Sequence, residues 1–102
     1  MDKNIKYSLA YKTNGTSLVG YIKTTYDELV KKLGEPNYGP SGDQKVTCEW
    51  ILEVDGDPCT IYDWKTGKTP KDLHKWHVGG TSSRPLSYLA KKFGWETSKF
   101  TF

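Results

Sequence analysis

A short helix with a defined start and a defined end constrains this fold more than any other feature. Residues 25–36 read TYDELVKKLGEP. Thr25 is predicted to be the N-cap and Glu28 to complete a capping box, while Gly34 and Pro36 are predicted to end the helix. Its apolar residues recur at i, i+3, i+4 and i+7, and therefore form one face: Tyr26, Leu29, Val30 and Leu33. Such a helix needs an apolar surface to cover, which the rest of the chain must supply.

Alternating apolar residues before this helix predict an N-terminal hairpin. Residues 5–11 alternate, and the turn signal Asn14-Gly15 separates them from residues 18–22. In the register where the apolar faces coincide, three cross-strand pairs are expected: Tyr11 with Leu18, Leu9 with Gly20 and Tyr7 with Ile22.

A second hairpin is predicted after the helix. Residues 46–54 and 59–64 alternate on either side of the turn at residues 55–58. This register places Val54 near Cys59 and Cys48 near Lys65, which is too far apart for a disulfide between the cysteines. Both are therefore expected to be free thiols in the core. The same register puts Glu49 on the face opposite to Asp63, which argues against a catalytic carboxylate pair.

The C-terminal third contains a short strand and a second helix. The strand is marked by Trp76 and Val78 and is expected to end at Gly79-Gly80. A helix follows over residues 84–93, with Ser83 as its cap and a stop at Gly94. The aromatic tail of residues 95–102 is expected to dock as a further strand or into a partner, which includes a second copy of the chain.

These elements predict an α+β fold. The order ββ-α-βββ-α gives a two-layer sandwich, with an antiparallel sheet of about five strands and two helices packed on one face. Aromatic residues make up 14% of the chain, whereas Leu, Ile, Val and Phe are few. Tyr and Trp must therefore fill much of the core.

Charge and hydropathy exclude several protein classes. The net charge is +3, but Arg84 is the only arginine and the lysines are scattered. Base-specific DNA reading is not expected, because it relies on bidentate arginine. Neither an apolar run of membrane-spanning length nor a secretory signal occurs, so the expected location is the cytoplasm.

Catalytic and metal-binding patterns are missing from the sequence. It contains no phosphate-binding loop, dinucleotide fingerprint or nucleophile elbow. His74 and His77 are three residues apart on a strand, and therefore point to opposite faces, which disfavours a shared metal. We therefore expect no catalytic residues, no metal and no cofactor, and favour a binding protein over an enzyme.

Polar and aromatic residues gather at the end of one predicted strand, along the next strand and at the start of the second helix. Aromatic faces can stack on a base, Gly-Gly permits close approach to the backbone, and a helix N-terminus favours anions. Together these residues predict a site for an anionic, nucleotide-like ligand; the alternative is that the aromatics are simply core. The predicted ligand-binding residues are Tyr62, Trp64, Lys65, Trp76, His77, Gly79, Gly80, Ser82 and Arg84.

Several of these segments resemble a widespread family of small tailed-phage proteins of uncharacterised function. Its features are a helix ending in Leu-Gly-x-Pro, a Glu-Trp strand, a Thr-Ile-Tyr-x-Trp-Lys strand and a Trp-His-Val-Gly-Gly motif. The matching positions are Leu33, Gly34, Pro36, Glu49, Trp50, 60–62, Trp64, Lys65 and 76–80. The resemblance spans residues 21–93 and implies a single domain, with a family core at 24–94, an added hairpin at 1–23 and an added tail at 95–102. Residues 66–73 look shorter and more basic than in the family.

The resemblance implies a phage context, in which small proteins often act against host defence. The first hypothesis is a binding protein that sequesters a nucleotide-derived immune signal. The second is an inhibitor that contacts a host defence protein, such as a CRISPR nuclease. The third is a small enzyme on a nucleotide or phosphorylated substrate, with His77 as acid or base and Lys65 or Arg84 holding phosphate. Non-specific binding of single-stranded nucleic acid is a fourth hypothesis.

Overall fold

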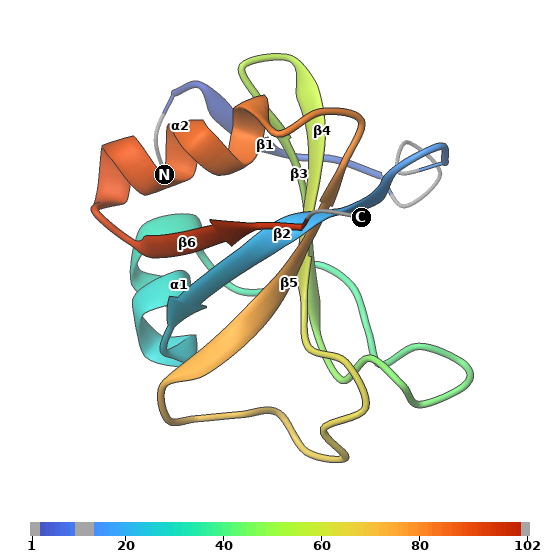
Figure 1. The fold of residues 1–102 in the computed structure, drawn as a ribbon. Helices are drawn as coiled ribbons and strands as arrows, with labels where there is room; N and C mark the ends of the chain where they lie inside the picture. The colour runs from blue at the N-terminus through green and yellow to red at the C-terminus, as the bar shows by residue number, and fades with distance from the viewer. Residues whose placement is uncertain (1–2, 10–13, 101–102) are drawn as a thin grey trace.

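The chain forms one antiparallel sheet with two helices. The computed structural model describes residues 3–9 and 14–100 of the protein, and the sheet order is β1-β3-β4-β5-β2-β6. Both helices lie on the same side of the sheet (Figure 1). The elements are β1 (Ile5–Tyr7), β2 (Ser17–Thr24), α1 (Tyr26–Leu33), β3 (Glu49–Val54), β4 (Asp57–Tyr62), β5 (His74–Gly80), α2 (Arg84–Phe93) and β6 (Glu96–Lys99). The predicted α+β class is confirmed, and β6 makes the sheet six-stranded.

Helix α1 begins and ends where the sequence predicts. The Thr25 hydroxyl accepts a hydrogen bond from the Glu28 backbone N–H at 3.1 Å, and Gly34 ends the helix with φ at 82°. The Glu28 carboxylate does not return to the cap. It accepts a hydrogen bond from the Trp95 indole at 3.4 Å instead, and so ties α1 to the segment between α2 and β6.

The core lies between the helices and the sheet and is centred on two tryptophans. Trp50 on β3 and Trp76 on β5 are fully buried, and their rings meet edge to face at 5.6 Å. The Trp50 indole N–H donates to the Gly34 carbonyl at 2.8 Å, and the Trp76 N–H donates to the Thr24 carbonyl at 3.0 Å. A large aromatic side chain can be buried in this way because its one polar group has a partner.

The predicted N-terminal hairpin is wrong. Strand β1 pairs with β3, with Tyr7 opposite Leu52, while β2 pairs with β5 on one side and β6 on the other. Tyr7 is therefore not opposite Ile22, and Leu9 is not opposite Gly20; the predicted partner Tyr11 lies outside the described residues. Alternation placed Ile22 in the core correctly, but Tyr7 and Leu9, which it also assigned to the core, are 45% and 60% exposed. Strands β5 and β6 pair with β2 instead of β1, and both offer longer ladders than β1 does.

The second hairpin is correct, but its register is two residues tighter than predicted. Leu52, not Val54, is opposite Cys59, and Val54 is opposite Asp57. Asp55 and Gly56 have φ values of 53° and 87°, so they alone form the turn. Asp-Gly favours such two-residue hairpin turns, and this preference outweighs the turn signal from Pro58, which lies within β4.

The remaining boundaries differ little from those predicted. Strand β5 ends at Gly80, as predicted, with Gly79 and Gly80 as its last two residues. Ser83 precedes α2 without a side-chain capping bond, whereas the Ser82 hydroxyl accepts from the Arg84 backbone N–H at 3.3 Å. The tail forms β6 along β2, which confirms the strand alternative.

Candidate functional site

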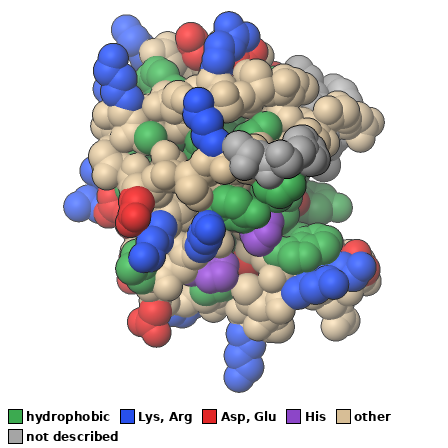
Figure 2. All heavy atoms as spheres, viewed as in Figure 1, with side chains coloured by type: hydrophobic (Ala, Val, Ile, Leu, Met, Phe, Trp, Pro, Cys, Tyr) green, Lys and Arg blue, Asp and Glu red, His purple; other side chains and the backbone are tan. Residues whose placement is uncertain are grey.

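The sheet face opposite the helices carries the candidate site. The register places five side chains in one row across five strands of this face: Glu49, Tyr62, His77, Tyr21 and Ser98. Each residue of the row is directly opposite the next, so their side chains are close neighbours. Figure 2 shows histidine and hydrophobic side chains together near the centre of its view, with lysines around them.

An aromatic stack occupies the middle of this row. The Tyr62 ring is stacked on the His77 ring, with centroids 5.4 Å apart and planes 27° apart. Tyr21 meets the other flank of His77 edge-on at 5.2 Å, and Trp64 meets Tyr62 edge-on at 6.4 Å. These contacts hold the rings in defined orientations, which leaves a preformed aromatic surface for a flat ligand.

His77 lies within the stack as a neutral imidazole at neutral pH. Burial lowers the pKa of His77 below its usual value, and the nearby His74 and Lys75 charges lower it further. Its Nδ1 atom is buried and has no hydrogen-bond partner among the described residues. A buried polar atom without a partner is uncommon and identifies a position where a ligand atom could bond.

Two hollows flank the aromatic stack on the same face. One has a volume of about 260 Å³, and its lining includes Glu49, Thr60, Tyr62, Trp64 and Gly79. The other, of about 300 Å³, lies beside Tyr21 and is lined by Lys23, Lys75, Glu96, Thr97 and Ser98.

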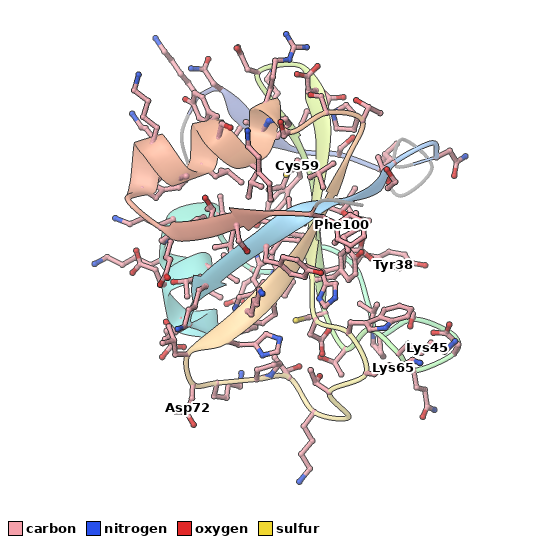
Figure 3. All side chains as sticks on the ribbon, viewed as in Figure 1. Tyr38, Lys45, Cys59, Lys65, Asp72 and Phe100 are labelled. Carbon is pink, nitrogen blue, oxygen red and sulfur yellow. The ribbon has the colours of Figure 1, made fainter. Side chains whose placement is uncertain are left out.

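Lysine side chains surround the aromatic rings. Lys45 and Lys65 place their ammonium groups 5.7 Å and 5.8 Å from the centre of the Trp64 ring, and Figure 3 shows both at the loops beside the sheet. Lys75 lies 4.4 Å from the centre of the Tyr21 ring. Both hollows therefore have cationic groups at their edges, which favours ligands that carry negative charge.

Buried Asp63 holds the two loops that carry Lys45 and Lys65. Its carboxylate accepts hydrogen bonds from the Thr47 N–H at 2.8 Å, the Thr47 hydroxyl at 2.6 Å, the Cys48 N–H at 3.3 Å and the Thr66 hydroxyl. Burial alone would raise the pKa of Asp63, but these hydrogen bonds outweigh burial and hold the pKa below its usual value. Asp63 is thus committed to structure, and Glu49 is the carboxyl group that lines the hollow.

The structure brings together five of the nine predicted ligand-binding residues. Tyr62, Trp64, Lys65, His77 and Gly79 lie on or beside the uncovered face. Gly79 is required here because a Cβ would lie 2.7 Å from the Thr60 hydroxyl, which explains its identity by packing and not by ligand approach.

The other four predicted residues lie elsewhere. Trp76 is fully buried in the core, so its ring is closed to a ligand. Gly80 is buried against the backbone of Pro58 and Ser82. Ser82 lies just before α2, where its hydroxyl accepts a hydrogen bond from the Arg84 backbone N–H. Arg84, at the start of α2, is 79% exposed and forms an ion pair with Asp57 at 2.9 Å. The predicted anion site at that helix N-terminus is therefore separate from the aromatic stack.

Four residues of the site were missed from the sequence: Tyr21, Lys45, Glu49 and Lys75. Tyr21 and Lys75 could have been found from the β2–β5 pairing, which the predicted hairpin concealed. Glu49 is opposite Tyr62 in the true register, and the predicted register, which would put it opposite Trp64, could also have placed it beside the site.

The cysteines and histidines show no arrangement for covalent or metal chemistry in the described part of the chain. Cys48 and Cys59 are free and buried, as predicted, and burial raises the pKa of the Cys59 thiol to about 12. His74 lies on the helix side of the sheet beside Trp76, on the face opposite to that of His77. No group of three metal-binding side chains occurs among residues 3–9 and 14–100, and no helix there is long and apolar enough to cross a membrane.

Comparison with protein-family models, curated proteins and solved structures finds no match to this chain. The resemblance to tailed-phage proteins therefore stays a prediction from sequence motifs.

Proposed function

We propose that this protein is a non-catalytic binding protein for a nucleotide-like ligand, which lies on the uncovered face of the sheet. The observation that carries the proposal is the Tyr62–His77 stack, with a hollow beside it and lysines around it. Aromatic rings offer stacking surfaces to a base, and lysines attract phosphate. Binding without catalysis is favoured because the thiols are buried with raised pKa values, while Asp63 is fully used in holding loops.

The biological role proposed for this binding is sequestration of a nucleotide-derived immune signal in the host cytoplasm. This part of the proposal rests on the resemblance to tailed-phage proteins alone. A protein with this role would need affinity for its ligand but no catalytic turnover.

Isothermal titration with cyclic dinucleotides, cyclic trinucleotides and ADP-ribose tests the proposal. At least one of these ligands should bind, and His77→Ala should weaken that binding without unfolding the protein. Lys91→Ala, an exposed change on α2 away from this face, is the matched control and should leave binding unchanged. Absence of binding to every nucleotide, together with capture of a host defence protein, would instead favour the inhibitor hypothesis.

Single-stranded nucleic acid is a second candidate ligand, because two hollows with cationic edges flank the stack on one continuous face. Affinity would then increase with strand length and fall steeply with salt, whereas a small ligand would bind with a weaker salt dependence. Titration of a dinucleotide and a longer oligonucleotide at two salt concentrations separates these cases.

A further inference from the structure

We propose that the hollow formed by Glu49, Tyr62 and Trp64 selects a guanine base, with the Glu49 carboxylate reading the base edge. This inference rests on the proposed function and deepens it, since it names the part of the ligand that the site distinguishes. The group that carries it is a carboxyl whose position and lack of partners have no structural explanation.

Glu49 lies at the first position of β3, directly opposite Tyr62 on the uncovered face. Its side chain is half-buried and lines the hollow. No hydrogen bond or ion pair engages its carboxyl group among the residues that the structure describes, although its backbone pairs with Tyr38. A carboxylate withdrawn from water normally has a hydrogen-bond partner, so the Glu49 carboxylate is positioned to accept hydrogen bonds from a ligand.

The donor pattern of guanine matches a carboxylate better than that of any other common base. Its Watson–Crick edge presents two adjacent donors, N1–H and the 2-amino group, and a carboxylate has two acceptor oxygens. Adenine and cytosine present one amino group next to an acceptor nitrogen, and uracil presents one N–H between two carbonyl groups. Each of those edges would place an acceptor lone pair against a carboxylate oxygen.

The size and charge of the hollow indicate which part of the nucleotide it holds. Its volume of about 260 Å³ lies below the range of about 300–1,000 Å³ for sites that enclose a drug-sized ligand. We infer that the base enters and stacks on Tyr62 or Trp64, while ribose and phosphate stay outside. Phosphate would be repelled by Glu49 but attracted by Lys45 and Lys65, whose ammonium groups lie near Trp64. Those ammonium groups also disfavour a cationic ligand, the other natural partner of a carboxylate among aromatic rings.

The ionisation of Glu49 supports this geometry. Burial raises the pKa of Glu49 to about 7. Two N–H donors would stabilise its charged form, so guanine binding near neutral pH should release a proton. The titratable side chains around this hollow are Tyr62, directly opposite Glu49, His77, whose ring is stacked on that of Tyr62, and Lys45 and Lys65, whose ammonium groups lie near Trp64.

Titration of the full chain with GMP, IMP, AMP, CMP and UMP tests the inference. GMP should bind about tenfold more tightly than AMP, CMP or UMP, because a bidentate pair contributes about 1–3 kcal/mol. IMP is the matched control, since it differs from GMP only in lacking the 2-amino group, and should also bind more weakly. Glu49→Gln should remove most of the preference for GMP. Glu53→Gln, on the same strand and face but outside the hollow, should keep it.

The outcomes separate the inference from the proposed function. Equal binding of all five nucleotides would overturn guanine selection while leaving nucleotide binding in place. A preference for GMP that survives Glu49→Gln would overturn the role of Glu49. Absence of binding by any guanine, adenine or pyrimidine nucleotide would overturn both. Circular dichroism of each variant confirms that it is folded, and Glu49→Ala provides a second variant if the glutamine form is not.

Discussion

Replacing Glu49 by glutamine should stabilise the protein in a pH-dependent way. Glu49 has no partner within the described residues, and burial raises its pKa from 4.5 to about 7. The folded state therefore holds a proton on Glu49 that the unfolded state has already released. Stability contributed by the neutral carboxyl is fully present below pH 4.5 and is lost as the pH rises toward 7. Glutamine has no charge to bury, so the variant avoids that loss.

The size of the effect follows from the pKa shift. One pKa unit corresponds to about 1.36 kcal/mol, so the full shift would correspond to about 3 kcal/mol. Because Glu49 is only half-buried, residual contact with water reduces this to about 1–2 kcal/mol. The free energy of unfolding of Glu49→Gln should therefore exceed that of the native protein by about 1–2 kcal/mol more at pH 8 than at pH 4.5.

Urea denaturation at both pH values, followed by tryptophan fluorescence, measures the difference. Packing differences between the two side chains are the same at both pH values and cancel in the comparison. Glu53→Gln is the control, since it makes the same chemical change on the same strand and face but outside the hollow. An equal effect of Glu49→Gln at the two pH values would refute the argument that Glu49 is desolvated without a partner.

Three further changes test the packing and the loops that support the site. Gly20→Ala would place a Cβ 2.3 Å from the Ser98 carbonyl oxygen, so it should destabilise the protein by about 2–3 kcal/mol in urea denaturation and increase amide exchange in β6. Asp63→Asn should lower the free energy of unfolding by about 2–3 kcal/mol at neutral pH. That loss should shrink as the pH falls through the depressed pKa of Asp63, because the native carboxylate then becomes protonated. Trp76→Ala should lower the free energy of unfolding by about 3–5 kcal/mol. Trp64→Ala, at a side chain 42% exposed, should lower it by less than about 1 kcal/mol and should instead weaken ligand binding.

The parts of the fold that depend on local signals were predictable. The ends of α1 at Thr25 and Gly34 were predictable because capping depends only on residues close in sequence. Alternation also assigned Trp50 and Ile22 to the buried face. The partner of each strand was not predictable in this way, because alternation defines a face but not a neighbour. Ile22 is buried in the core whereas Tyr7 is 45% exposed, and their strands are at different positions in the sheet.

The candidate site was predictable where neighbouring residues along β4 and β5 carry it. Tyr62 and His77 were selected because aromatic and polar residues gather along β4 and β5. Trp76 was selected with them, since a single sequence does not show which face of β5 the helices cover. Tyr21 and Glu49 were missed, because they join the site only through cross-strand pairing.

The same pairing explains why the site forms on this face. On the helix side, the rows across the sheet contain large apolar side chains such as Trp50 and Trp76, which are buried in the core. On the other side, the row through His77 contains two tyrosines and a carboxyl, and no helix covers it. A half-exposed aromatic row with an unpaired Glu49 contributes less to folding than an apolar row would, because the carboxyl is desolvated without a partner. The ligand site proposed above would account for such a row on a face bordered by lysines.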